Sequence, residues 1–169
     1  GAGVTPTLRP YQHEAVADVR QAFGAGHRRV LFVLPTGAGK TVTFTYITEN
    51  AAAKGNRVLI LVHRVELLDQ ASDSLTAMGV RHGLIAANRS MNLAPMVQVA
   101  SVQTIARRLS KLPRDLFQLV IVDEAHHATA GTWAQVINHF SGAKVLGVTA
   151  TPVRGDGRGL GEQFDEMVM

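Results

Sequence analysis

The residues best suited to chemistry lie in two short stretches, and the first combines glycines with a lysine and threonines. Residues 35–41 read Pro-Thr-Gly-Ala-Gly-Lys-Thr, between an apolar run at 30–34 and a helical pattern from Thr41 to Ala53. Glycines let backbone N–H groups approach an anion, and a helix N-terminus adds unpaired donors and a positive dipole end. Strand, glycine turn and helix is the context that a phosphate-binding loop requires. We therefore predict that Lys40 reaches terminal phosphates and that the Thr41 hydroxyl holds Mg²⁺.

This first stretch matches only the second half of the full phosphate-loop motif. The motif G-x-x-x-x-G-K-[ST] requires a glycine at position 34, where this chain has Leu34. A chance glycine turn ahead of a helix that begins Lys-Thr is the alternative interpretation.

The second stretch is an apolar run at 119–122 that ends in two carboxylates, Asp123 and Glu124. In a parallel α/β sheet, ligands bind beyond the carboxyl ends of the strands, so Asp123 would lie beside the glycine turn. Phosphoryl transfer needs a carboxylate near Mg²⁺ and a group that positions the attacking water. Asp123 suits the metal, through its water shell, and Glu124 suits activation of the water. The alternative is a solvated turn at a strand end.

Apolar runs and helical patterns alternate along the chain. The runs predict strands at 30–34, 57–62, 80–86, 96–100, 117–122 and 144–149, and the helical patterns lie at 15–23, 41–53, 65–78, 102–109 and 132–140. This alternation predicts an α/β fold with a mainly parallel β-sheet and helices on both faces. The pattern at 41–53 carries β-branched residues that favour a strand. We predict a helix there because a phosphate-binding loop requires one.

Composition narrows the class of protein. The 169 residues are 46% hydrophobic, carry a net charge of +4 and include no cysteine. That length predicts one domain, and the lack of cysteine excludes disulfides and thiolate metal sites and fits a reducing cytoplasm. No apolar run approaches the roughly 20 residues of a membrane span. The mild positive charge permits a polyanionic partner.

Residues 123–126, Asp-Glu-Ala-His, carry a family resemblance. They look like the box that names DEAH-type members of the superfamily 2 helicases. Four further stretches resemble helicase motifs in the same order, namely 8–12 (adenine side), 35–41 (motif I), 62–67 (motif Ia) and 147–152 (motif III). The chain is thus similar to the N-terminal RecA-like P-loop domain of superfamily 2 DEAD/DEAH-box helicases. It looks most like bacterial and phage helicases of the RadD and type III restriction-subunit kind.

The resemblance implies a role for each matching residue. Adenine would be contacted by Arg9 and Gln12. The phosphates and Mg²⁺ of ATP would be held by Thr36, Gly37, Ala38, Gly39, Lys40 and Thr41. Asp123 would be the metal-linked acid, Glu124 the catalytic base and His126 a link to motif III, while Thr149 and Thr151 would couple nucleotide state to domain movement. A nucleic-acid backbone would be touched by His63, Arg64, Ser101, Gln103 and Thr104.

The residues themselves support the nucleic-acid contacts less strongly. Arg64 follows a predicted strand, at the same sheet edge as Lys40. Ser101 and Thr104 flank a helix start, where hydroxyls and free N–H groups can bind a phosphate, although Ser101 could equally be a plain N-cap. Residues 107, 108 and 111 are basic and could extend a positive stripe; a solvated helix face is the interpretation we favour.

Histidines and the single tryptophan suggest no other site. His126 and His127 lie near Glu124, but the spacing is not that of a zinc motif. Surface or hydrogen-bonded core positions are expected for His13, His27, His82 and His139. Trp133 lies in a helical pattern, where a core position is expected.

The family has two RecA-like domains, with the nucleotide between them, and few residues follow Pro152 here. We therefore expect residues 1–169 to form one ATP-binding domain. Residues 1–3, Gly-Ala-Gly, are expected to be a cloning remnant. The resemblance implies a second RecA-like domain in the same polypeptide and a monomeric fragment that binds ATP–Mg²⁺ but turns over slowly. It implies nucleic acid as partner, DNA more than RNA, no membrane, and the cytoplasm of a bacterium or a phage-infected host. A nucleotide-gated binding module without turnover and a small-molecule kinase are the alternatives.

Overall fold

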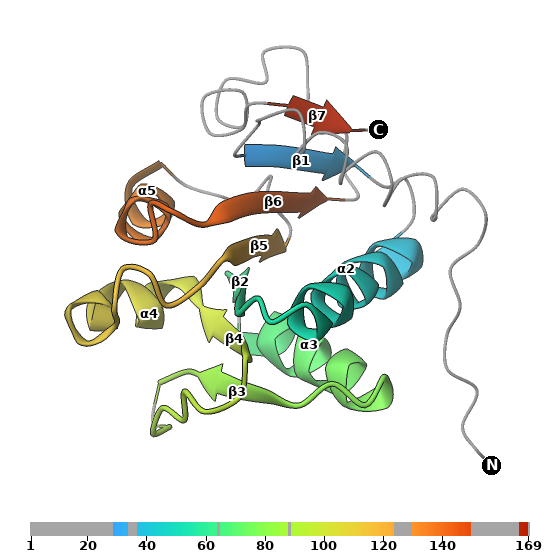
Figure 1. Cartoon of the computed structure of the whole chain (residues 1–169), viewed down its shortest axis with the longest axis horizontal. Helices are drawn as coiled ribbons and strands as arrows, with labels where there is room; N and C mark the ends of the chain where they lie inside the picture. The colour runs from blue at the N-terminus through green and yellow to red at the C-terminus, as the bar shows by residue number, and fades with distance from the viewer. Residues whose placement is uncertain are drawn as a thin grey trace.

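A parallel sheet of seven strands forms the centre of the molecule (Figure 1). The computed structural model describes residues 29–33, 37–63, 65–87, 89–123, 130–149 and 166–168. The strands are β1 (Arg29–Val33), β2 (Val58–Val62), β3 (His82–Ile85), β4 (Val97–Ser101), β5 (Leu119–Asp123), β6 (Lys144–Thr149) and β7 (Glu166–Val168). Their order is β3-β4-β2-β5-β6-β1-β7, and each described pairing is parallel. The predicted α/β fold is confirmed.

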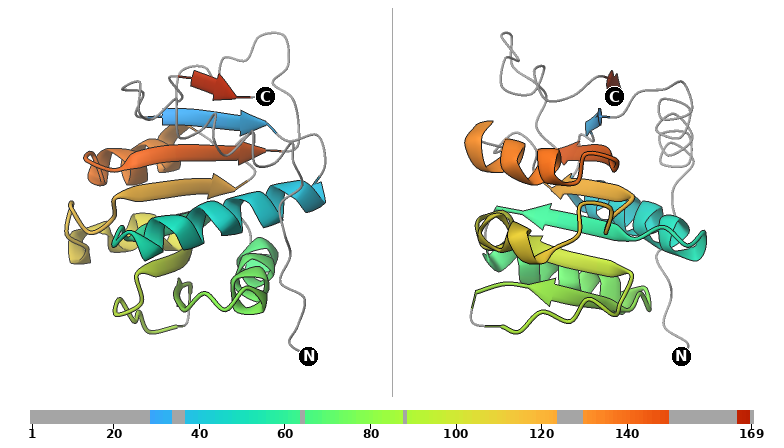
Figure 2. Two further views of the ribbon diagram at one scale, coloured as in Figure 1. Left: turned by 45° about the vertical axis from the view of Figure 1, so that its right-hand side comes forward. Right: turned by 60° about the vertical axis from the view of Figure 1, so that its left-hand side comes forward.

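Helices cover both faces of the sheet (Figure 2). One face carries α2 (Gly37–Ala53) and α3 (Val65–Ala77), and the other carries α4 (Val102–Arg108), the 3₁₀ turn η1 (Leu109–Lys111) and α5 (Ala130–His139). All five residues of β2 are buried, and they alternate between two cores. Burial on both faces explains why this strand reads as a continuous apolar run rather than an alternating one.

Helix α2 forms despite its β-branched residues. Thr43, Thr45 and Thr48 are all buried within it. The Thr48 hydroxyl donates to the Phe44 carbonyl at 2.8 Å, so its polar group is satisfied inside the helix. Phe44 lies in the core against the sheet, and tertiary burial of this kind outweighs the local propensity. The helix predicted from the phosphate loop is confirmed.

Several boundaries differ from the predicted ones. Helix α2 begins at Gly37 rather than Thr41, so both glycines of the predicted turn lie in its first turn. Helix α4 ends at Arg108, whereas the predicted helix ran to 109, and the chain continues as η1 to Lys111. Strand β7 was not predicted from sequence, because its three residues carry no periodic pattern. The helix predicted at 15–23 lies outside the described residues.

The connection from β3 to β4, residues 86–96, packs Met91 and Leu93 against the core beside α4 and contains no helix or strand in its described part. Three side chains from elsewhere bind its carbonyl groups. Gln98 donates to Asn92 and Pro95 at 2.8 and 3.0 Å, Arg57 donates to Leu93 at 3.1 Å, and Arg108 donates to Ala86 and Arg89 at 3.2 and 3.3 Å. These bonds satisfy backbone acceptors that a helix would otherwise satisfy internally.

Candidate nucleotide and nucleic-acid site

The two chemical stretches meet at the carboxyl edge of the sheet. β1 ends at Val33 and α2 begins at Gly37, while β5 ends at Asp123. One strand, β6, separates β1 from β5, and it pairs Val33 with Thr149 and Asp123 with Val148. With strands about 5 Å apart, the ends of β1 and β5 lie roughly 10 Å from each other. A polyphosphate with its metal spans a gap of this size.

The groups at this edge have the chemistry that ATP–Mg²⁺ requires. Asp123 is only 5% exposed, and a buried carboxylate is a hard oxygen ligand that suits Mg²⁺. No acidic residue lies in the first turn of α2, so no side chain of that turn neutralises its N–H donors and positive dipole end. The backbones of Lys40 and Thr41 lie in the first two turns of this helix. The described residues therefore fit a hydrated magnesium beside a phosphate chain.

Other residues predicted to bind the nucleotide, to catalyse its hydrolysis or to couple it to domain movement lie outside the described residues. They are Arg9, Gln12, Thr36, Glu124, His126 and Thr151. Thr149 is the last residue of β6, at the same edge as Asp123. The roles of all these residues stay predictions.

Candidate nucleic-acid contacts gather at the neighbouring part of the same edge. Half-buried His63 directly follows β2, and Ser101 ends the adjacent strand β4, paired with Val62. Ser101 occupies the N-cap position of α4, yet its hydroxyl makes no capping hydrogen bond there. The hydroxyl cap is therefore not its role in this structure. Gln103 is exposed and Thr104 half-buried in the first turn of α4, and Arg64 lies outside the described residues.

Arg108 differs from the solvated residue that the sequence suggested. Its guanidinium donates to the carbonyls of Ala86 and Arg89, so it joins α4 to the 86–96 connection. These partners precede it by 22 and 19 residues, and no local pattern could have revealed them. Arg107 and Lys111, by contrast, are exposed as expected for a solvated face.

The described histidines outside this edge have structural roles. His82 bonds Ser72 Oγ through Nε2 at 2.7 Å and the Val80 carbonyl through Nδ1 at 2.9 Å. His139 Nε2 bonds the Leu112 carbonyl at 2.7 Å. Within the described residues, no group of three or more His, Cys, Asp or Glu side chains could hold a metal ion. None of the described helices is long and apolar enough to cross a membrane.

Comparison with known proteins identifies the family. Residues 5–154 match the family described as "Type III restriction enzyme, res subunit". The chain is 36% identical over 175 residues to irc3 of Schizosaccharomyces pombe, assigned as a mitochondrial ATP-dependent helicase, covering 95% of this chain and 28% of that protein. It is 31% identical over 153 residues to the DNA 3'-5' translocase XPB2 of Sulfurisphaera tokodaii, covering 89% and 32%. Relatives named for RNA are also matched.

Solved structures agree on the fold. The Hef helicase domain of Pyrococcus furiosus superposes with a TM-score of 0.78 at 24% identity, covering 95% of this chain and 37% of that one. The chain spans about a quarter of the length of the first curated relatives, at 28%, 26% and 26%. The parallel sheet and the family match agree with the resemblance seen in the motifs. The chain belongs to the type III restriction enzyme res-subunit family and has the N-terminal RecA-like domain of a superfamily 2 helicase.

Proposed function

We propose that this chain is the ATP-binding half of a nucleic-acid-dependent ATPase, a DEAH-type helicase or translocase that hydrolyses ATP to ADP and phosphate. One observation carries the proposal: the buried carboxylate of Asp123 and the N-terminus of α2 lie at the same edge of the sheet, one strand apart. A candidate metal ligand, Asp123, and a candidate phosphate-binding helix N-terminus, at Gly37, are thereby combined from segments more than 80 positions apart in the sequence. The family membership supports the same reaction.

In this proposal the residues at the edge divide the work of phosphoryl transfer. Lys40 and the first N–H groups of α2 bind the phosphates, and Thr41 and Asp123 hold Mg²⁺, the latter partly through water. Mg²⁺, when bound, would neutralise phosphate charge as it builds up. Glu124 orients the attacking water, which approaches the γ-phosphate in line with the leaving oxygen. Arg9 and Gln12 select adenine.

Nucleic acid would lie across the neighbouring strand ends. The contacts proposed are His63, Arg64, Ser101, Gln103 and Thr104. Thr149 and Thr151 would couple the state of the nucleotide to domain movement. His126 would link the nucleotide site to residues 147–152. The adjacency of β2 and β4 supports a shared surface for His63 and Ser101. We propose DNA rather than RNA as this partner; one relative is named as a DNA translocase, and two others are named as RNA helicases.

A second RecA-like domain in the same polypeptide would complete the site. The short span of this chain relative to its relatives supports that arrangement. Arginines from such a domain can accelerate phosphoryl transfer by roughly 10³–10⁵-fold. The 169-residue chain is therefore expected to bind ATP–Mg²⁺ as a monomer and to hydrolyse it slowly. The lack of cysteine suits a reducing compartment such as the cytoplasm of a bacterium or a phage-infected host.

Thermal unfolding with and without nucleotide tests the binding half of the proposal. ATP–Mg²⁺ at 100 times its dissociation constant should stabilise the chain by about 2.7 kcal/mol, with a smaller effect of GTP–Mg²⁺ at the same concentration. Lys40→Ala should abolish the shift. Lys54→Ala, which removes an exposed lysine beyond the end of α2, is the matched control and should retain it. A shift that survives in Lys40→Ala would rule out the phosphate-binding loop.

Turnover by the full-length protein distinguishes the helicase from a binding module that never hydrolyses ATP. Glu124→Gln should keep ATP binding and lose nucleic-acid-stimulated hydrolysis. Normal hydrolysis in that variant would show that the base is another residue. No hydrolysis by the wild type, with DNA or RNA present, would favour the binding module.

A further inference from the structure

The α4 side of the molecule carries a concentration of positive charge. Four basic side chains are exposed there: Arg89 in the 86–96 connection, Arg107 on α4, Lys111 at the end of η1 and Arg114 in the next turn. We call these four residues the α4 basic face. Among the described side chains of residues 89–148, Asp115 is the one exposed carboxylate. Electrostatic attraction on this side therefore favours an anion with several charges.

The opposite helical layer has the opposite sign. On α2 and α3, Glu49, Glu66, Asp69 and Asp73 are exposed. The three acidic residues of α3 lie at helical spacing, so they share one side of that helix. A net charge of +4 spread evenly would not produce two such layers. Among the described side chains, exposed cations are therefore concentrated on the α4 side.

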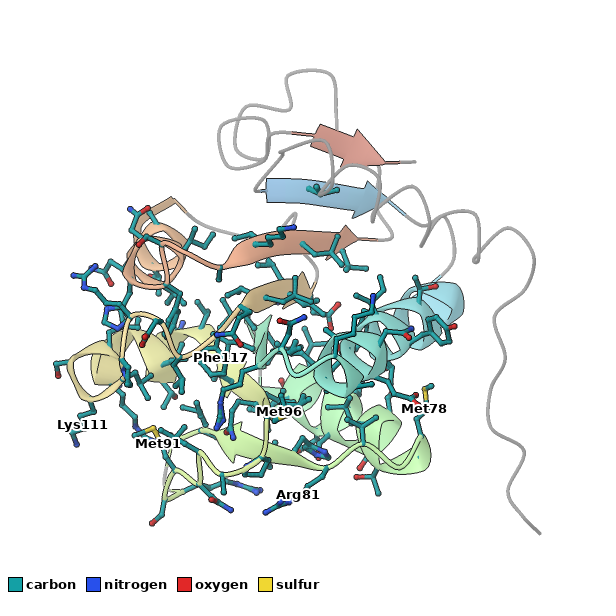
Figure 3. All side chains as sticks on the ribbon, viewed as in Figure 1. Met78, Arg81, Met91, Met96, Lys111 and Phe117 are labelled. Carbon is teal, nitrogen blue, oxygen red and sulfur yellow. The ribbon has the colours of Figure 1, made fainter. Side chains whose placement is uncertain are left out.

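The structure holds the basic face in place. Arg108 is half-buried and donates to the carbonyls of Ala86 and Arg89, which fixes the backbone that bears the Arg89 side chain. Lys111 ends η1, the 3₁₀ turn that directly follows α4. Figure 3 places Lys111 and Met91 toward the same outer side of the molecule, with Arg81 projecting from another part. The cations thus come from braced segments rather than from an open loop.

The basic face continues the proposed nucleic-acid site. Gln103 and Arg107 are both exposed, and their spacing of four places them on the same side of α4, about 6 Å apart along its axis. Gln103 belongs to the edge where Ser101 and His63 lie. From that edge, exposed polar side chains continue along α4 and then η1 to Lys111, away from the proposed nucleotide site.

The chemistry of the face fits phosphates rather than bases. Proteins that grip single strands combine cations with aromatic side chains that stack on bases. Here the described phenylalanines of this layer, Phe117 and Phe140, are buried. In the described part of this layer, the cations thus have no exposed phenylalanine beside them, and such cations contact the sugar–phosphate backbone, which a duplex presents on its outside. Resting on the proposed function, we infer that the α4 basic face binds the phosphate backbone of a nucleic-acid duplex that flanks the strand held at the sheet edge.

Salt-dependent binding of a 25-base-pair labelled DNA duplex, measured by fluorescence anisotropy, tests the inference. The test variant is R107Q/K111Q, and K54Q/R81Q is the control, since it removes the same charge from exposed positions outside the face. Each lost phosphate contact should reduce the salt slope by about 0.9, so the test variant should lose about 2 from the slope. At 0.1 M salt, its affinity should fall about tenfold or more. The control should stay within about twofold of the wild type.

The possible outcomes separate this inference from the proposed function. Equal losses in both variants would overturn the inference, because net charge alone would explain binding. Wild-type affinity in R107Q/K111Q would also overturn it, while leaving the helicase proposal intact. Binding of neither duplex nor single strand by the wild type would contradict both the inference and the nucleic-acid half of the proposed function. Thermal unfolding midpoints equal to the wild type confirm that each variant is folded.

Discussion

The two faces of the sheet are covered in different ways. On one face, α2 and α3 have 17 and 13 residues and supply the helical cover. On the other, α4 and α5 have only 7 and 10 residues, and the 86–96 connection extends the cover, with Met91 and Leu93 packed on the core. Irregular chain lacks the internal hydrogen bonds of a helix, so long polar side chains must satisfy its carbonyl groups. On the face with the short helices, Arg57, Gln98 and Arg108 therefore donate hydrogen bonds to carbonyl groups of the 86–96 connection.

Charge follows the same division. Acidic side chains are exposed on the long helices, and basic ones on the face with the braced connection. The two cores also differ in their described residues, because the core beside α5 includes an aromatic pair and the other one has a single phenylalanine among aliphatic residues. Packing, bracing and charge can each be tested by a pair of matched variants.

Removal of a core ring should have the largest effect. Phe140→Ala should lower the free energy of unfolding by about 3–5 kcal/mol. It should cost roughly 1 kcal/mol more than Phe44→Ala, because Phe140 packs edge-on with Phe117, and such pairs are worth about 0.5–1.5 kcal/mol beyond burial. The Phe117 and Phe140 ring centroids lie 5.1 Å apart at 78°. Urea unfolding measures both; a larger loss in Phe44→Ala would show that the aliphatic core is the stronger of the two.

A methyl group added at Gly83, beside the 86–96 connection, should have the next largest effect on the free energy of unfolding. A Cβ on Gly83 would lie 2.5 Å from Gln98 Oε1 and 2.6 Å from the Asn92 carbonyl oxygen. Because that backbone atom cannot move freely, Gly83→Ala should cost about 1–3 kcal/mol. Gly142→Ala is the control, since no atom lies within 4 Å of its added methyl, and it should stay within about 0.5 kcal/mol of the wild type. Equal stability of both variants in urea unfolding would mean that the connection is not tightly seated.

Substitution of the neighbouring residues Arg107 and Arg108 should have the smallest effects on the free energy of unfolding, and the two effects should differ. Arg108→Gln should cost about 1–2 kcal/mol, because it removes a charged donor from the carbonyl of buried Ala86. Arg107→Gln makes the same chemical change at an exposed position, so thermal unfolding should register less than about 0.5 kcal/mol. If both substitutions cost the same, Arg108 would be a solvated residue, as the sequence first suggested.

Much of the fold and part of the site were predictable from residue types. Continuous apolar runs identify the strands at 30–34, 57–62 and 144–149, since a parallel sheet buries both faces of each strand. Helix α2 was predicted correctly only because a phosphate loop requires it, in opposition to local propensity. The position of Asp123 at a strand end follows from the same motifs, whereas α2 begins at Gly37 and not at the predicted Thr41. Glu124, His126 and the adenine contacts lie outside the described residues and stay predictions.

By itself the sequence determined the alternation of strands and helices, the α/β class and the residues that can do phosphate chemistry. These depend on short-range patterns of apolar residues, glycines and carboxylates. Only the tertiary structure decided the strand order, which places a single strand, β6, between β5 and β1. It also decided that Arg108 braces the 86–96 connection while Arg107 stays exposed. Such contacts join residues about 20 or more positions apart, and periodicity along the chain carries no information about which distant carbonyl a side chain will reach.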